Sequence, residues 1–154
     1  MIALLAAVPA LDNGLALTPP MGWNPYNNFS GSYNESIVRE HASLIVSLGL
    51  KALGFEYVNL DARWGSRERG SDGRLVPNTD FPTLASGGLA AYIHGLGLKF
   101  GIYGDEGKYD CGGAAGNFGN EAVDAQTFAD WGVDYLKSGA TPTPPRYANP
   151  PPCF

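Results

Sequence analysis

The sequence contains little cysteine, little charge and no long apolar run, and each shortage excludes a class of protein. Its 154 residues include 2 cysteines, so at most one disulfide bridge can form within the chain. Charged residues make up 16% and the net charge is -5, which gives no basic surface for nucleic acid. No apolar stretch approaches the ~20 residues of a membrane span. We therefore expect neither a nucleic-acid partner nor a membrane partner.

The remaining composition is that of a globular protein, with 44% hydrophobic and 12% aromatic residues. The length suggests a single domain. Residues 2–10 are small and apolar and end in Val8-Pro9-Ala10, which resembles the cleavage site of a signal peptide. We interpret residues 1–10 as a signal-peptide remnant and predict a secreted protein. The alternative is a short apolar N-terminal arm.

Three segments of the chain repeat one plan, in which a helical stretch is followed by a glycine and then by a short apolar strand. The predicted helices cover residues 35–49, 81–97 and 122–132, and the predicted strands cover residues 21–24, 57–61, 99–105 and 133–137. Gly49, Gly97 and Gly132 stand where a left-handed residue ends a helix. The order β-α-β-α-β-α-β predicts parallel strands joined by right-handed crossovers.

The first predicted helix has the clearest apolar stripe. Asn34 can cap its first turn. Apolar side chains and one histidine then recur at three- and four-residue steps, which predicts one buried face made of Ile37, His41, Leu44, Ile45 and Leu48.

Alternating strands and helices fit either a doubly wound sheet or a (β/α)8 barrel, and the residues at the strand ends favour the barrel. Trp, Asn, Asp, Tyr and Lys side chains gather at or just past these ends, at Trp23, Asn24, Asp61, Trp64, Tyr103, Asp105 and Lys137. In barrels this rim is the face that carries the active site. Acids and amides bind hydroxyl groups, and aromatic faces stack on sugar rings, so the set predicts a sugar pocket.

Five motifs carry a resemblance to a known family: TPPMGWNPYN (18–27), GLKALGFEYVNLD (49–61), DGRLVPN (72–78), GLKFGIYGDEG (97–107) and DAQTFADWGVDYLK (124–137). In this order and spacing the chain resembles the α-galactosidases (melibiases) of glycoside hydrolase family 27. The resemblance implies that residues 11–137 are the first half of a (β/α)8 TIM barrel, truncated after about four strands. It also implies retaining hydrolysis of terminal α-linked galactose by two aspartates, with no metal or other cofactor.

The resemblance assigns substrate-binding roles to five residues. The family's pocket tryptophan falls on Trp23, and its hydroxyl-binding strand-end aspartate falls on Asp61. The pocket tyrosine and the acid two residues later fall on Tyr103 and Asp105, although a structural role for Asp105 fits equally well. The lysine that precedes the nucleophile falls on Lys137, where it could bind a sugar hydroxyl.

The chain departs from the family pattern after the second strand. The usual Asp-Asp-Cys-Trp is replaced by Asp61-Ala62-Arg63-Trp64. This removes one carboxylate and one of the two cysteines of a family disulfide bond. The loop after the first strand lacks the other cysteine as well. Ala62 therefore leaves the choice of sugar open.

A second departure begins after Lys137, where the family's Tyr-Asp-Asn-Cys is replaced by Ser138-Gly139-Ala140-Thr141. Gly139 takes the nucleophile's position, and the resemblance leaves Cys111 without its usual partner. Whether Cys111 pairs with Cys153 stays open. We interpret residues 138–154 as a proline-rich aberrant tail.

These departures predict that the chain has no α-galactosidase activity, because the nucleophile is missing and the acid/base residue would lie beyond residue 154. Two alternatives remain: a non-catalytic galactose-binding remnant, and an unrelated (β/α) barrel aldolase that uses Lys137 as a Schiff-base amine. The unclosed edges of a half barrel also predict association into oligomers.

Overall fold

The computed structural model describes Gly14 and residues 17–140. The expected signal remnant, Cys153 and most of the expected tail lie outside these residues. In chain order the elements are β1 (Gly22–Trp23), α1 (Tyr26–Phe29), α2 (Glu35–Ser47), the 3-10 helix η1 (Leu50–Leu53), β2 (Tyr57–Asn59), α3 (Gly88–Gly95), β3 (Lys99–Asp105), α4 (Glu121–Asp130) and β4 (Tyr135–Gly139).

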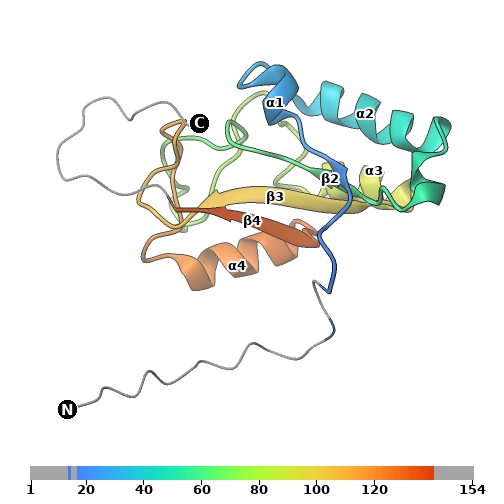
Figure 1. Ribbon diagram of the computed structural model, residues 1–154. Coiled ribbons are helices and arrows are strands. Elements are labelled where there is room, and N and C mark those ends of the chain that lie inside the picture. The colour runs from blue at the N-terminus through green and yellow to red at the C-terminus, as the bar shows by residue number, and fades with distance from the viewer. Residues whose placement is uncertain (1–13, 15–16, 141–154) are drawn as a thin grey trace, which may run out of the picture.

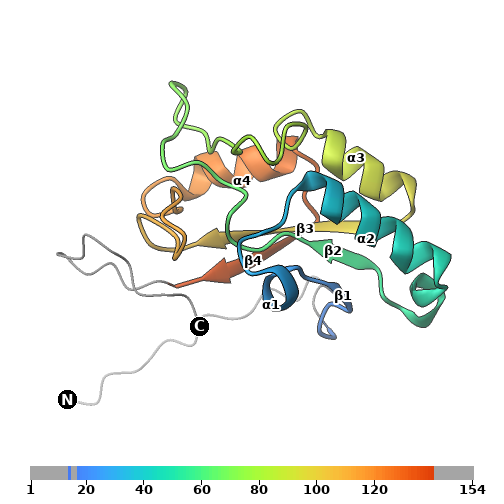
Figure 2. The same ribbon diagram turned by 90° about the horizontal axis from the view of Figure 1, so that it is seen from above.

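The four strands form one parallel sheet in the order β1-β2-β3-β4 (Figure 1). Each crossover passes through a helix, and helices α2, α3 and α4 all lie on the same side of the sheet (Figure 2). A doubly wound sheet would have helices on both faces, whereas a barrel has them only on the outside. The described chain therefore has the architecture of a partial (β/α) barrel, as the sequence predicts.

The hydrophobic core fills the space between the sheet and its helices. Alternate strand residues point into it, because side chains alternate between the two faces of a strand. Val58 from β2, Leu60 just after it, and Phe100 and Ile102 from β3 are fully buried there. The intervening residues belong to the opposite face, which in a barrel is the interior.

The buried face of α2 differs from the predicted stripe. Val38, Ala42 and Ile45 are buried, whereas Leu44 and Leu48 are exposed, so the prediction was wrong for these two leucines. Two apolar stripes overlap on this helix, and the stripe with the smaller side chains faces the core. Asn34 caps the helix as predicted, because its side chain accepts a hydrogen bond from the Ile37 amide at 3.0 Å.

The predicted element ends lie within two residues of the observed ones, except for the start of α3. Gly49, Gly97 and Gly132 all have positive φ angles, as predicted for residues that end helices. The second helix begins only at Gly88, because residues 81–87 form turns rather than helix. Strand β4 continues through Gly139, two residues past the predicted end of the regular fold. No helix in the described part of the chain is long and apolar enough to cross a membrane.

A buried ion pair ties the loop after β2 to α4. Arg69 makes two hydrogen bonds to the Asp124 carboxylate, at 2.6 and 2.8 Å. The same guanidinium donates to the carbonyl of Gly116 at 2.6 Å, and Asn117 donates to Asp124 at 2.6 Å. These contacts hold the loop between β3 and α4 over the carboxyl end of the sheet.

Candidate functional site

Four of the predicted site residues come together at the carboxyl end of the sheet. Asp61 lies two residues past the end of β2, Tyr103 and Asp105 lie on β3, and Lys137 lies on β4. Tyr103 pairs with Lys137 in the strand register, and Asp105 pairs with Gly139. All of these positions alternate with the core-facing residues, so their side chains belong to the barrel-interior face.

The Asp61 carboxylate is the centre of this group and is almost completely buried. Its Oδ2 atom accepts hydrogen bonds from Lys137 Nζ at 2.5 Å and from Asn24 Nδ2 at 2.8 Å. Its Oδ1 atom accepts from the Ala62 amide at 2.8 Å. The lysine side chain remains 47% exposed, so a ligand can reach the ammonium group. The cluster therefore offers a fixed carboxylate and an accessible cation side by side.

Tyr33 fixes the backbone beneath this carboxylate, a role the sequence did not indicate. Its hydroxyl donates to the Asp61 carbonyl at 2.7 Å, and the Asp61 amide donates back to the hydroxyl at 3.1 Å. Burial raises the pKa of the Tyr33 hydroxyl well above its ordinary value. The phenol therefore stays protonated and holds the end of the strand in place.

Tyr103 and Asp105 form the second part of the site. The Tyr103 hydroxyl donates to Asp105 Oδ2 at 3.0 Å, and the Gly107 amide donates to Asp105 Oδ1 at 2.7 Å. Burial, and then the nearby Asp105, raise the pKa of Tyr103. Lys137 Nζ lies 5.6 Å from the centre of the Tyr103 ring, which joins this pair to the Asp61 group.

Trp23 lies apart from this cluster. Its indole ring stacks on the imidazole of His41 in α2, with ring centres 4.4 Å apart. Position 23 pairs with the core-facing Val58, so the indole lies on the helix side of the sheet. The next residue, Asn24, reaches Asp61 instead. The two neighbours are separated because successive side chains of an extended segment point to opposite faces.

Gly139 ends β4 at the position where the resemblance places the nucleophile. A Cβ atom built on this glycine would lie 2.5 Å from the Tyr103 hydroxyl and 3.0 Å from Asp105 Oδ2. The space beside the strand end is therefore filled by the tyrosine–aspartate pair.

Cys111 borders the site, with its sulfur 4.0 Å from the Tyr103 hydroxyl. It is disulfide-bonded, although the cysteine with which the resemblance would pair it is replaced by Thr141. The other cysteine of the chain, Cys153, lies outside the described residues.

No group of three or more His, Cys, Asp or Glu side chains within residues 17–140 is arranged to hold a metal ion. The polar groups that converge at the strand ends are hydrogen-bond donors and acceptors. They are the carboxylates of Asp61 and Asp105, the ammonium of Lys137, the amide of Asn24 and the phenol of Tyr103. Such a set at the carboxyl rim of a parallel (β/α) sheet is typical of barrel enzymes that bind polyhydroxylated ligands.

Comparison with known proteins agrees with this class and narrows it to one family. The family model described as Alpha galactosidase A (melibiase) matches residues 18–142. The chain belongs to the α-galactosidase family.

One relative and two solved structures illustrate the extent of the match. The α-galactosidase of Coffea arabica is 52% identical over 129 residues, which cover 82% of this chain and 34% of the relative. The crystal structure of α-galactosidase I from Mortierella vinacea has 44% identity and a TM-score of 0.78, and the match covers 83% of this chain and 32% of that one. The structure of α-galactosidase from Saccharomyces cerevisiae with raffinose has 43% identity and a TM-score of 0.78, covering 82% and 28%. The chain spans about a third of the length of the curated relatives it matches.

Proposed function

We propose that the strand-end cluster binds the hydroxyl groups of a terminal α-linked galactose. The observation that carries the proposal is the pairing of the Asp61 carboxylate with Lys137 and Asn24. A carboxylate accepts hydrogen bonds from hydroxyl groups, and an ammonium or amide donates to them, so adjacent hydroxyls on one sugar find complementary partners. The relatives are named α-galactosidases, and one is solved with raffinose, which supports a galactoside as the ligand.

We propose further that this chain binds galactose without cleaving it. Retaining glycosidases need a carboxylate nucleophile and a carboxylic acid about 5–5.5 Å apart. Gly139 has no side chain to attack the sugar, and the adjacent space contains the Tyr103 hydroxyl. Asp61 does not replace the missing nucleophile, because Lys137 and Asn24 already donate to its Oδ2 atom.

The proposal gives Trp23 a packing role rather than a contact with sugar, because its ring is stacked on His41. The aldolase alternative receives no support from the site. Lys137 Nζ already donates to Asp61, whereas a Schiff-base amine attacks through a free lone pair.

We also propose that the protein is secreted. The signal-like residues 2–10 support this location, and so does the disulfide bond of Cys111, because such bonds persist mainly in oxidising compartments. Association through the outer edges of β1 and β4 would cover the strand edges that the described residues leave unpaired.

The experiment that tests the function combines binding and turnover on the full chain. We expect galactose to shift the NMR signals of Asp61, Tyr103 and Lys137, and an aryl α-galactoside to remain uncleaved. Asp61→Asn should abolish galactose binding, because an amide nitrogen would then oppose the donors of Lys137 and Asn24.

A control variant, Asp130→Asn on the outer face of α4, should bind galactose like the parent. If the parent chain cleaves the aryl α-galactoside and Asp61→Asn abolishes this cleavage, the proposed absence of catalysis is wrong. Absence of galactose binding by the parent chain would refute the proposed site.

A further inference from the structure

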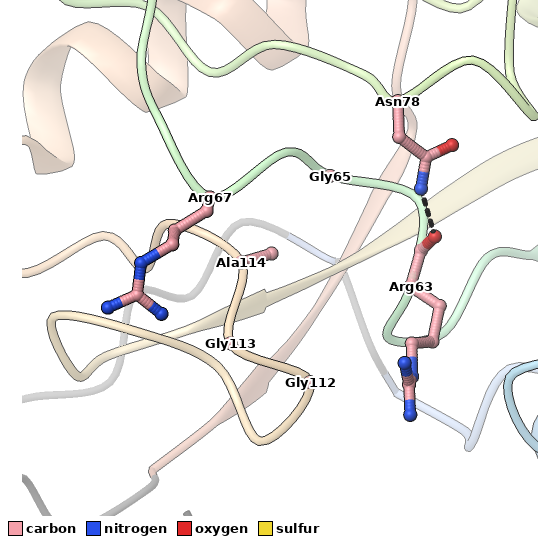
Figure 3. Close-up of a pocket in the computed structure, with 7 residues that line it drawn as sticks. All are labelled: Arg63, Gly65, Arg67, Asn78, Gly112, Gly113 and Ala114. Carbon is pink, nitrogen blue, oxygen red and sulfur yellow. Dashed lines mark hydrogen bonds between the residues drawn. The ribbon is translucent and has the colours of Figure 1, made fainter. Parts of the chain in front are cut away.

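A separate hollow of about 320 Å³ lies beside the candidate site, between the loop that follows β2 and the loop that follows β3. Arg63 and Arg67 come from the first loop, and Gly112 and Gly113 form the facing turn (Figure 3). Its volume is at the lower end of the ~300–1,000 Å³ of ligand pockets, which suits a single sugar unit or a similar small group.

The two arginines stand against adjacent glycines. A Cβ atom on Gly112 would lie 3.3 Å from Arg63 Cδ, and one on Gly113 would lie 3.8 Å from Arg67 Nη1. The glycine pair therefore leaves room beside both guanidinium-bearing side chains. Arg67 is further oriented by the ring of Tyr109, whose centre lies 4.5 Å from the guanidinium carbon.

Arg63 has an unusual backbone that the surrounding structure supports. Its φ angle is 89°, a region that side chains other than glycine rarely adopt. Asn78 Nδ2 donates to the Arg63 carbonyl at 2.7 Å, and the side chain passes close to Gly31. Residues in such conformations persist where the structure over-determines them, and they cluster at ligand sites.

Two carboxylates lie near the hollow, and neither makes a buried ion pair with its arginines. Asp110 directs Oδ1 to the Ala114 amide at 2.8 Å, and burial raises the pKa of its carboxyl group. Glu68 lies 3.9 Å from Arg67 Nε, but both side chains are mostly exposed, so solvent screens this contact. Within the described residues, Arg63 and Arg67 are exposed, and neither forms an ion pair with a buried carboxylate.

We propose that this hollow binds an oxyanion, a carboxylate or a sulfate, carried by the sugar unit attached to the galactose. The proposal rests on the proposed function, because it places the galactose at Asp61. Arg63 lies two residues after Asp61, and Gly112 follows Cys111, which contacts the Tyr103 hydroxyl. Guanidinium groups bind carboxylate and sulfate oxygens through paired N–H donors, which makes an acidic galactoside the ligand class.

The test is an NMR titration of the full chain with glucuronate, glucose 6-sulfate, glucose and inorganic sulfate. We expect one or both charged sugars to shift the amide signals of Gly112 and Gly113, and glucose to leave them in place. The charged sugar that binds identifies the oxyanion. Arg63→Gln and Arg67→Gln should each weaken binding by roughly tenfold, the effect of losing one charge-assisted hydrogen bond.

Two variants control for charge and folding. Arg63→Lys keeps the charge but not the paired donors, and should bind at an intermediate strength. Arg74→Gln removes an arginine that pairs with Asp130 outside the hollow, and should bind like the parent. If neither charged sugar binds more tightly than glucose, the proposal is wrong; if inorganic sulfate binds as tightly as the charged sugars, the assignment to a saccharide is wrong.

The same samples separate this proposal from the proposed function. Arg63→Gln should still bind galactose, which also shows that the variant is folded. Asp61→Asn should lose galactose but retain the charged sugar. If the parent chain binds the charged sugars but not galactose, the proposed function is wrong. If it binds galactose but not the charged sugars, the proposed site in the hollow is wrong.

Discussion

Two Arg–Asp pairs with the same shortest N–O distance join the loop after β2 to α4, and they differ in burial and in the number of hydrogen bonds between the partners. The Arg69–Asp124 and Arg74–Asp130 pairs both have N–O distances of 2.6 Å. The side chains of the first pair are 17% and 2% exposed, and those of the second are 38% and 42% exposed. Asp124→Ala and Asp130→Ala therefore compare the loss of a buried, doubly bonded ion pair with the loss of an exposed, singly bonded one.

Removing Asp124 leaves the charge of Arg69 buried without its carboxylate. Breaking a buried pair in this way costs about 3–5 kcal/mol. Arg69 keeps its contacts to the carbonyls of Gly73 and Gly116, so we expect about 3 kcal/mol, the lower end. This is a large part of the ~5–15 kcal/mol that stabilises a domain. Asp130→Ala should have little effect, because solvent screens the exposed pair.

Urea unfolding followed by tryptophan fluorescence measures the difference, since Trp64 and Trp131 are buried and report on the core. With a slope of about 1–3 kcal/mol per molar urea, a loss of about 3 kcal/mol lowers the midpoint by roughly 1–3 M. Replacing both Arg69 and Asp124 with apolar residues should cost less than Asp124→Ala alone, because no buried charge remains. Equal shifts for Asp124→Ala and Asp130→Ala would refute the expectation that the buried, doubly bonded pair contributes more stability.

Two further predictions concern buried polar groups. Burial alone would raise the pKa of Glu35, but hydrogen bonds from Thr83 and the ion pair with Arg39 hold it below its ordinary 4.5. The stability that Glu35 contributes is therefore present above pH 4.5 and lost as the pH falls through the lowered pKa. Glu35→Gln should reduce the loss of the urea midpoint at acid pH. The same acid dependence in the variant and the parent would contradict this prediction. Tyr33→Phe leaves the Asp61 amide and carbonyl without their buried partner, so it should cost about 1–3 kcal/mol in urea unfolding and weaken galactose binding; a variant as stable as the parent would show that the hydroxyl is dispensable.

The parts of the fold that depend on local sequence could be predicted. Strand β3 has the predicted bounds, Lys99–Asp105, because an apolar run there is closed by glycine before it and polar residues after it. The helix-ending glycines follow from the left-handed conformation that they adopt at low cost. The buried face of α2 could not be settled locally, because two apolar stripes overlap and only packing against the sheet selects Val38 over Leu44.

The candidate site was predictable as a location but not as a set of contacts. Parallel strands bring their carboxyl ends to one edge, so Asp61 and Lys137 were expected to be neighbours although 76 residues separate them. The face on which a side chain lies depends on its position in the alternation along the strand. A two-residue strand such as β1 scarcely defines this alternation, so the sequence does not predict that Trp23 lies on the helix side. Tyr33 gave no signal because its role is to bond backbone atoms of a distant loop.

Gly139 lacks a carboxylate, and its neighbours also occupy the space that a side chain at this position would need. The Tyr103 hydroxyl lies where it can donate to Asp105, and a Cβ at position 139 would approach this hydroxyl to 2.5 Å. The hydrogen bond between Tyr103 and Asp105 and the glycine on β4 are therefore mutually dependent features. Any nucleophile at this strand end would first require the tyrosine to move, which would also change the group that lies beside Lys137. The proposed galactose-binding group around Asp61 does not depend on that rearrangement, since its hydrogen bonds come from Lys137, Asn24 and the Ala62 amide. The proposed function therefore predicts that galactose binding at Asp61 persists without a carboxylate at position 139.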